Sequence, residues 1–386
     1  MKVPSIFSAL LLASAAGFAA LTPAAAGDYV VGVIVPQSGQ TAFIGDSALK
    51  AMILRAEQIN AEGGINGHKI KLDAQDEKCN PTSAVNIAQE FVNGSGVAGV
   101  LGPFCSADSI AVKPIFARAK VVDLTVASTA DAITKDSKWT FQIAAPDGVY
   151  AQTLANYAAD HGKKIAILND TSAFGLGAYA TVDKVLKQRN ANVVAHEQIT
   201  AGQADLTPQV LKLKQAGADF VVALVLGGDA AKLCLTSRDL GFKAQLAGQT
   251  AWSFPNVLSL SKGACDGAIF TDPFDPDKPE AKSMLDAYQK RWNDRPQSYF
   301  AAAGWDALSL WAEAAKKAGT AGSDEIDQEK LLDALDNTKG YKGVMGVGDA
   351  TINFSATDHI ALDVDGTHLR RIQGDKLISL GDEKSK

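Results

Sequence analysis

DEKCNPTSAVNIAQEFVNGSGVAGVLGPFCSADS, residues Asp76 to Ser109, decides the fold of this chain. After Pro81, which suits a first helical turn, apolar residues recur at helical spacing. Residues 97–101 then indicate a short buried strand, and a new helix is expected to begin near Ser106. The free N–H groups and short hydroxyls at its start suit an anion or carboxylate. The alternative is that Ser106 only caps the helix.

The same alternation of strands and helices extends in both directions from this stretch. Residues 29–35 form a continuous β-branched run, typical of a parallel strand that is buried on both faces. One α/β series runs to about residue 146, and a second begins with a helix near 148–161 and a strand at 165–168. A length of 386 residues also favours two domains. We therefore expect an α/β fold of two doubly wound, Rossmann-like lobes.

The first 26 residues differ from the rest of the chain. Lys2 precedes an apolar run at 6–18, and three alanines at 24–26 resemble a cleavage site. A membrane anchor would need about 20 unbroken apolar residues, so residues 1–26 are predicted to be a signal peptide. With 47% apolar residues, a net charge of −6 and no basic block, the exported chain is expected to be globular and not to bind nucleic acid.

Four cysteines in an exported chain favour disulfides over metal or redox chemistry. Three pairings are possible, and proximity in the sequence favours Cys79 with Cys105 and Cys234 with Cys265.

No pattern of catalytic or cofactor chemistry stands out. The five histidines lack metal-ligand spacing, and neither a Walker A pattern nor a G-x-S-x-G elbow is present. Two S-x-x-K matches, at 47–50 and 259–262, lack the partner motifs of a penicillin-binding enzyme. We expect no metal, no cofactor and no enzymatic activity, and instead a small ligand bound in a cleft between the lobes, outside the carboxyl ends of parallel strands.

Three stretches carry a resemblance to a known family: INAEGGING at 59–67, the turn at 76–81 with Cys79, and GPFCS at 102–106 with Cys105. On these the chain resembles, over its full length, the type I periplasmic binding proteins of the leucine/isoleucine/valine class, which serve ABC importers. The resemblance implies a Cys79–Cys105 disulfide, three crossovers between the lobes and a ligand cleft that closes by hinge motion.

It also implies discontinuous lobes: 28–146 plus 275–345 for the first, and 147–274 plus 346–386 for the second. The partners it implies are a small amino acid or organic carboxylate and the permease subunits of an ABC importer. The expected location is the periplasm, and the expected state is a monomer.

In the amino-acid binders of this family, a serine after the second cysteine and a threonine at the next strand end hold the ligand carboxylate. These resemble Ser106 and Thr129, with Ala127 as the small residue two positions before the threonine. Ser128, at the same strand end, and Thr250, across the cleft, are also expected to contact the ligand. Asp147 falls where the family places a polar group at the first crossover, although it can equally be the N-cap of the helix that follows.

The chain departs from the family where the ligand ammonium and side chain would bind. Three tyrosine positions hold Ile44, Phe174 and Leu226, and the segment 248–252 around Thr250 lacks the family's glutamate. Because a buried ammonium without a carboxylate costs several kcal/mol, Asp147 or Asp170 would have to replace that glutamate if the ligand is an amino acid.

Five aromatic residues at expected loops or strand ends are candidates for an apolar wall of the cleft, with core packing as the alternative: Phe43, Phe104, Phe174, Trp252 and Phe254. The leading hypothesis is a periplasmic protein that delivers a branched-chain or other hydrophobic amino acid to an importer. One alternative is an aromatic or other organic carboxylate or amide as ligand, and another is a ligand-sensing receptor component.

Overall fold

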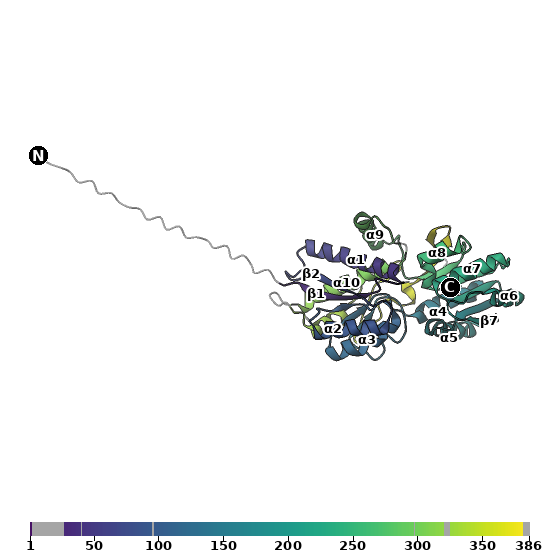
Figure 1. Cartoon of the computed structure of the whole chain (residues 1–386), viewed down its shortest axis with the longest axis horizontal. Helices are drawn as coiled ribbons and strands as arrows, with labels where there is room; N and C mark the ends of the chain where they lie inside the picture. The colour runs from purple at the N-terminus through teal and green to yellow at the C-terminus, as the bar shows by residue number, and fades with distance from the viewer. Residues whose placement is uncertain (2–26, 40, 95, 297, 320–324, 381–386) are drawn as a thin grey trace.

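The computed structural model describes residues 1, 27–39, 41–94, 96–296, 298–319 and 325–380. The expected signal peptide therefore lies, except for Met1, outside the described residues. Figure 1 shows two lobes side by side, with α1, α2, α3, α9 and α10 in one and α4 to α8 in the other. The two α/β lobes expected from the sequence are confirmed.

Among the residues described, the first lobe holds a five-stranded sheet and six helices: β1 (Tyr29–Val35), α1 (Ala42–Ala61), β2 (Ile70–Asp76), α2 (Pro81–Asn93), β3 (Val100–Leu101), α3 (Ser106–Ala119), β4 (Asp123–Thr125), β5 (Thr140–Gln142), α9 (Pro279–Trp292), α10 (Phe300–Ala318) and α11 (Gln328–Asp336). All strands are parallel, in the order β2-β1-β3-β4-β5. Along β1, Val31 and Val33 face the core under α1 and α10, whereas Ile34 faces α2 and α3. This alternation buries both faces of the sheet, as a doubly wound fold requires.

The second lobe contains the remaining elements: α4 (Asp147–His161), β6 (Ile165–Asp170), α5 (Ala173–Gln188), β7 (Val193–Ile199), α6 (Thr207–Gln215), β8 (Phe220–Leu224), α7 (Gly227–Asp239), β9 (Gln245–Gly248), the 3-10 turn η1 (Thr250–Ser253), α8 (Pro255–Ser261), β10 (Ile269–Asp272), the 3-10 turn η2 (Val364–Gly366), β11 (His368–Gln373) and β12 (Lys376–Ser379). Its sheet has the order β12-β11-β10-β9-β8-β6-β7 and is parallel except for the hairpin β11–β12 at one edge. On β6, Ile165 and Ile167 pack under α4 and α5, and Ala166 and Leu168 face the core under α6 and α7.

The chain passes between the lobes after β5, after β10 and before β11. The segment before β11 packs with the first lobe, because Ile360 pairs in parallel with Gln142 and the side chains of Phe354 and Leu362 lie in the first-lobe core. His368–Gln373 then forms an antiparallel hairpin with Lys376–Ser379. We propose that the third crossover lies between Leu362 and His368.

Each lobe carries one disulfide, and the two pairings favoured by the sequence are both present. Cys79 bonds to Cys105 in the first lobe and Cys234 to Cys265 in the second. In the part of the chain that the structure describes, none of the helices combines the length and apolar character that crossing a bilayer needs.

Candidate functional site

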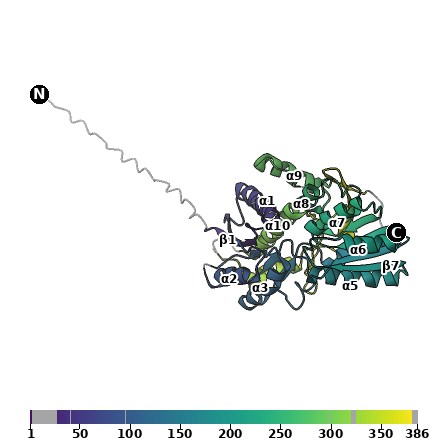
Figure 2. The same cartoon turned by 45° about the vertical axis from the view of Figure 1, so that its right-hand side comes forward.

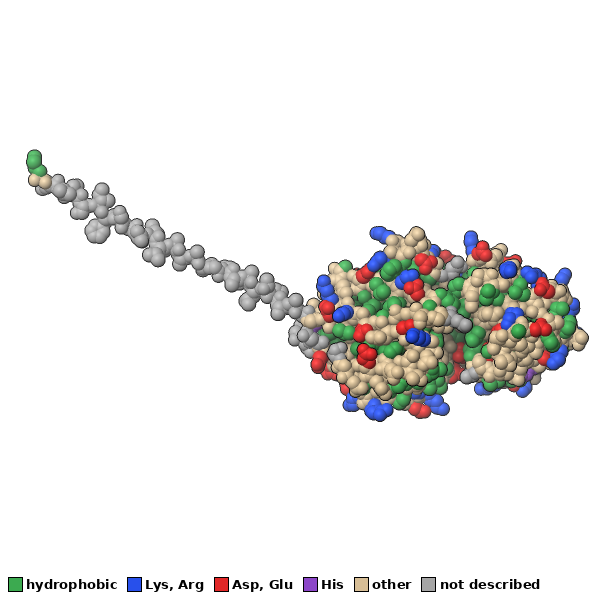
Figure 3. Space-filling view, in the orientation of Figure 1, with side chains coloured by type: hydrophobic (Ala, Val, Ile, Leu, Met, Phe, Trp, Pro, Cys, Tyr) green, Lys and Arg blue, Asp and Glu red, His purple; other side chains and the backbone are tan. Residues whose placement is uncertain are grey.

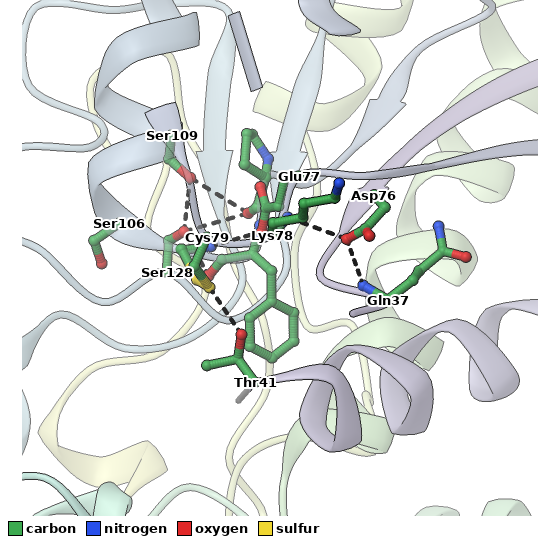
Figure 4. The surroundings of a disulfide bond; sticks show 12 residues. Gln37, Thr41, Asp76, Glu77, Lys78, Cys79, Ser106, Ser109 and Ser128 are labelled. Carbon is green, nitrogen blue, oxygen red and sulfur yellow. Dashed lines mark hydrogen bonds between the residues drawn. A yellow bond between two sulfur atoms is a disulfide. The ribbon is translucent and has the colours of Figure 1, made fainter. Parts of the chain in front are cut away.

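The turn before α3 is fastened to the end of β2 in two ways (Figure 4). The Cys79–Cys105 disulfide is one connection, and the Glu77 carboxylate is the other, because it accepts hydrogen bonds from the N–H groups of Phe104 and Cys105 at 3.0 and 3.1 Å. Glu77 is fully buried. Burial and the neighbouring carboxylate of Asp108 raise the pKa of Glu77 above its usual range. This acid, which the sequence analysis missed, fixes the position from which α3 starts.

Ser106 is the first residue of α3, and the N-cap position belongs to Cys105, whose side chain makes no capping bond. The Ser106 Oγ accepts hydrogen bonds from the N–H groups of Thr129 and Ala130, at 3.1 and 3.3 Å. Ser106 and Thr129 are both half-buried, so the structure brings together the two residues expected to hold a carboxylate. Because Ser106 accepts these two bonds, its own O–H proton can be donated elsewhere.

Ser128 and Ala127 are directed into the first lobe. The Ser128 hydroxyl lies 2.6 Å from the Ser109 hydroxyl and donates to the Phe104 carbonyl at 3.0 Å. Figure 4 shows the Ser109 and Ser128 hydroxyls joined by a hydrogen bond, with the Ser106 side chain apart from them. Ala127 belongs to the hydrophobic core of the lobe. Ser128 therefore connects the loops that carry Ser106 and Thr129.

Asp147 joins these loops to the second lobe. Its N–H donates to the Thr129 carbonyl at 2.7 Å, and its carbonyl lies 3.5 Å from Nε2 of Gln249. Asp147 is the first residue of α4, and Pro146 occupies the N-cap position. Burial raises the pKa of Asp147 to about 7, with a hydrogen bond from the Thr129 side chain opposing the rise and the charge of Asp131 adding to it. A continuous set of contacts thus runs from Ser106 to Gln249, from one lobe to the other.

At the carboxyl edge of the second sheet lie Asp170, the last residue of β6, and Gln249 and Thr250, which follow β9. The Thr250 side chain hydrogen-bonds with the phenol of Tyr299, which precedes α10 in the first lobe. Asp170 Oδ1 accepts a bond from the Ser172 N–H at 2.9 Å at the start of α5. Among the described residues, no hydrogen-bond partner is present for Asp170 Oδ2 or Gln249 Oε1, although both side chains are buried.

The aromatic candidates divide into two groups. Phe43 is 38% exposed and meets Phe254 edge-on, with 6.0 Å between ring centroids, and Phe254 lies 5.5 Å from Phe300. Phe104 is buried and packs 5.4 Å from Phe300. Phe254 belongs to the second lobe and its two partners to the first, so these rings connect the lobes. Trp252 is fully buried in the second-lobe core instead of lining the junction.

Phe174, the second residue of α5, is half-buried and lies near the same sheet edge as Asp170. Sequence reasoning missed Gln249, Tyr299 and Phe300 as well as Glu77. The sequence held one sign of Gln249: it is a polar residue directly after an apolar strand, within the segment 248–252 where the family has a glutamate.

One group of three potential metal ligands occurs within the described ranges: Glu77, Cys79 and Cys105. Both cysteines are joined in the disulfide, so neither offers the thiolate that binds metal.

The chain forms two α/β lobes joined by three crossovers, and polar strand ends meet where the lobes join. This arrangement is typical of solute-binding proteins. Figure 3 shows the two lobes as separate masses with a groove where they meet. The sequence model of the family described as "Periplasmic binding protein" matches residues 28–363, and the chain belongs to this family.

Known proteins of similar sequence and structure agree with this assignment. The chain is 28% identical to the leucine-, isoleucine-, valine-, threonine- and alanine-binding protein of Pseudomonas aeruginosa, over 86% of this chain and 88% of that protein. It is 29% identical to the Leu/Ile/Val-binding protein of Escherichia coli, over 90% and 98%. The crystal structure of the branched-chain amino acid transporter substrate-binding protein LivJ from Streptococcus pneumoniae, in complex with isoleucine, superposes with a TM-score of 0.79 at 25% identity, covering 91% of this chain and 97% of that one.

Proposed function

We propose that this protein is the periplasmic substrate-binding component of an ABC importer, that it holds a small carboxylate ligand between its lobes, and that it acts by hinge closure without catalysis. The observation that carries the proposal is the contact between Ser106 Oγ and the Thr129 N–H at the carboxyl end of the first sheet. A hydroxyl that accepts two backbone bonds is held in one orientation, and its proton is then available to a ligand oxygen.

A branched-chain or other hydrophobic amino acid is the first candidate ligand. The names of the Pseudomonas and Escherichia relatives support it, and so does the apolar character of Phe43 and Phe254 at the junction. Permease subunits of the importer would be the partner of the closed form. The predicted signal peptide and the family support a periplasmic location.

An aromatic or other organic carboxylate, or an amide, is the second candidate. It is favoured by the segment 248–252, which contains no acidic residue to pair with an ammonium group, and by the Phe43, Phe254 and Phe300 rings that connect the lobes. The same fold also suits a ligand-sensing receptor component, which would present its closed form to a signalling protein.

A thermal-shift screen of amino acids, aromatic acids, amides and short diacids tests the proposal. A ligand present at 100 times its Kd stabilises the folded state by about 2.7 kcal/mol, which gives a clear rise in melting temperature. We expect at least one amino acid or organic carboxylate to give such a shift. If no carboxylate in the screen does, the proposed function is wrong.

A further inference from the structure

The two disulfides of the chain differ in how far they are buried. Cys79, after β2, and Cys105, at the N-cap of α3, are both half-buried, whereas Cys234 and Cys265 are each 1% exposed in the second-lobe core. Thiol–disulfide exchange needs the approach of a thiolate to a sulfur atom, so access decides which bond reacts. A thiol reaches the first disulfide in the folded protein, and it reaches the second only when the core of the second lobe opens.

The position of Cys105 makes its sulfur a good leaving group. Cys105 is the N-cap residue of α3, and its side chain makes no capping hydrogen bond. The first N–H groups of a helix have no partner within the helix, and together with the helix dipole they stabilise a thiolate at the cap. Burial raises the pKa of both nearby acids, Glu77 and Asp108, which limits the negative charge that opposes such a thiolate.

Cys79 lies in a strained turn beside a hydroxyl. Lys78 and Cys79 have φ angles of 58° and 48°, in the left-handed region that residues with a side chain disfavour. The Thr41 hydroxyl lies 3.3 Å from Cys79 Sγ, and it is the donor because a disulfide sulfur carries no proton (Figure 4). Opening the disulfide therefore releases the turn, and Thr41 is placed to stabilise a Cys79 thiolate.

The disulfide is also connected to the candidate binding site. Ser106 directly follows Cys105, and its Oγ accepts hydrogen bonds from the N–H groups of Thr129 and Ala130 at 3.1 and 3.3 Å. When the disulfide opens, the start of α3 loses its covalent connection to the end of β2, and the hydrogen bonds of Glu77 remain. The Ser106 hydroxyl is then held less firmly.

We propose that the Cys79–Cys105 disulfide is a site of thiol–disulfide exchange with a dithiol, and that its reduction weakens ligand binding at Ser106. The effect on binding rests on the proposed function, whereas the exchange itself does not.

The exchange has two steps. A thiolate of the dithiol attacks Cys79 Sγ, the S–S bond breaks, and its electron pair leaves on Cys105 Sγ. The second thiolate of the dithiol attacks the sulfur now joined to Cys79, which forms the disulfide of the oxidised dithiol and releases Cys79 as a thiolate. Two electrons thus pass from the dithiol to the protein, and the two protons of the dithiol end on Cys79 and Cys105.

Labelling of the folded protein tests the exchange and needs no ligand. The oxidised protein is incubated with dithiothreitol without denaturant, and free thiols are alkylated with N-ethylmaleimide and quantified by peptide mass spectrometry. Cys79 and Cys105 should be labelled at least about 10-fold faster than Cys234 and Cys265. With glutathione, a monothiol whose adduct can be trapped after the first step, the adduct should lie on Cys79. Equal rates for the two disulfides, or an adduct on Cys105, would overturn the inference.

Hydrogen exchange tests the connection to the site, again without a ligand. Reduction should speed the exchange of the Thr129 and Ala130 N–H groups, while the strands of the second-lobe sheet keep their protection. The double substitution Cys234→Ser with Cys265→Ser is the matched variant, because it keeps only the first disulfide and should respond to dithiothreitol as the wild type does. If labelling shows the first disulfide to be open and these two N–H groups exchange as before, the connection is wrong.

Calorimetric titration with a ligand from the thermal-shift screen measures the effect on binding. Reduction should lower the affinity about 10-fold, and reoxidation should restore it. The variant Cys79→Ser with Cys105→Ser should not respond to dithiothreitol. Full affinity of the reduced protein would overturn the control of binding and leave the proposed function intact. If no carboxylate binds, the proposed function fails, and labelling and hydrogen exchange still decide whether the disulfide exchanges.

Discussion

Among single residues, Ser106 and Ser128 have hydroxyls that differ in burial and in hydrogen-bond partners. Ser106 is half-buried at the lobe junction and accepts two backbone hydrogen bonds. Ser128 is buried and bonds to Ser109 and to the Phe104 carbonyl within the first lobe. We propose that the Ser106 hydroxyl binds ligand, whereas the Ser128 hydroxyl links the loops of the first lobe.

Ser106→Ala is expected to weaken the binding of a carboxylate ligand by about 1 to 3 kcal/mol, because one charge-assisted hydrogen bond is lost. Calorimetric titration measures this change. Ser128→Ala is the comparison: it should lower the free energy of unfolding in urea by about 1 to 3 kcal/mol while affecting affinity less. Full affinity in the Ser106→Ala variant would remove this hydroxyl from the binding site.

The pairing of Ser106 with Thr129 was predictable, because both residues follow apolar strands and the carboxyl ends of neighbouring parallel strands meet at one edge. The buried positions of Glu77 and Gln249 could not be predicted. A single carboxylate in a polar turn carries no local sign of burial, and a buried amide is recognised only when its partners are known. The sequence also placed Trp252 among the candidates for the cleft wall, because periodicity does not separate a core aromatic from one at a junction.

At the scale of elements, the start of α3 depends on the disulfide and on Glu77. The double substitution Cys79→Ser with Cys105→Ser removes the disulfide, which joins two residues 26 apart in the sequence. It should lower the free energy of unfolding by about 3 kcal/mol. It should also weaken ligand binding, because Ser106 is adjacent to Cys105. The matched variant Cys234→Ser with Cys265→Ser removes a bond within the second-lobe core. It should cost similar stability with a smaller loss of affinity. Equal losses of affinity would mean that the first disulfide has no specific effect on the site.

Glu77 gives the first lobe a pH dependence. The pKa of Glu77 is higher in the folded state than in the unfolded chain, so Glu77 ionises at a lower pH when the chain is unfolded. Its contribution to stability is therefore complete at acid pH and is lost as the pH rises toward the raised pKa. The free energy of unfolding should fall by up to about 1.4 kcal/mol per pH unit. Glu77→Gln keeps an acceptor for the Phe104 and Cys105 N–H groups but cannot ionise. Urea unfolding between about pH 5 and 9 should give a smaller slope for this variant, and identical slopes would exclude Glu77 as the source.

At the scale of the whole molecule, the Phe254 ring connects the lobes through Phe43 and Phe300. This contact could not be derived from the sequence, because it depends on how the two lobes are placed relative to each other. Each aromatic pair contributes about 0.5 to 1.5 kcal/mol beyond its buried area. The contact therefore favours the arrangement in which the lobes are close.

Phe254→Ala should shift the ligand-free protein toward more separated lobes, and small-angle X-ray scattering should show a larger radius of gyration. Phe242→Ala removes a phenylalanine from the second-lobe core without touching the first lobe, and serves as the control. It should reduce stability but leave the radius of gyration unchanged. The same radius in both variants would show that Phe254 does not set the distance between the lobes.

A crystal structure of the complex with the compound that gives the largest thermal shift would locate the ligand. We expect the ligand to lie between the lobes, with a carboxylate oxygen about 3 Å from Ser106 Oγ. A ligand bound elsewhere, for example in the surface pocket of about 450 Å³ between α10 and α11, or between the lobes without contact to Ser106, would contradict it.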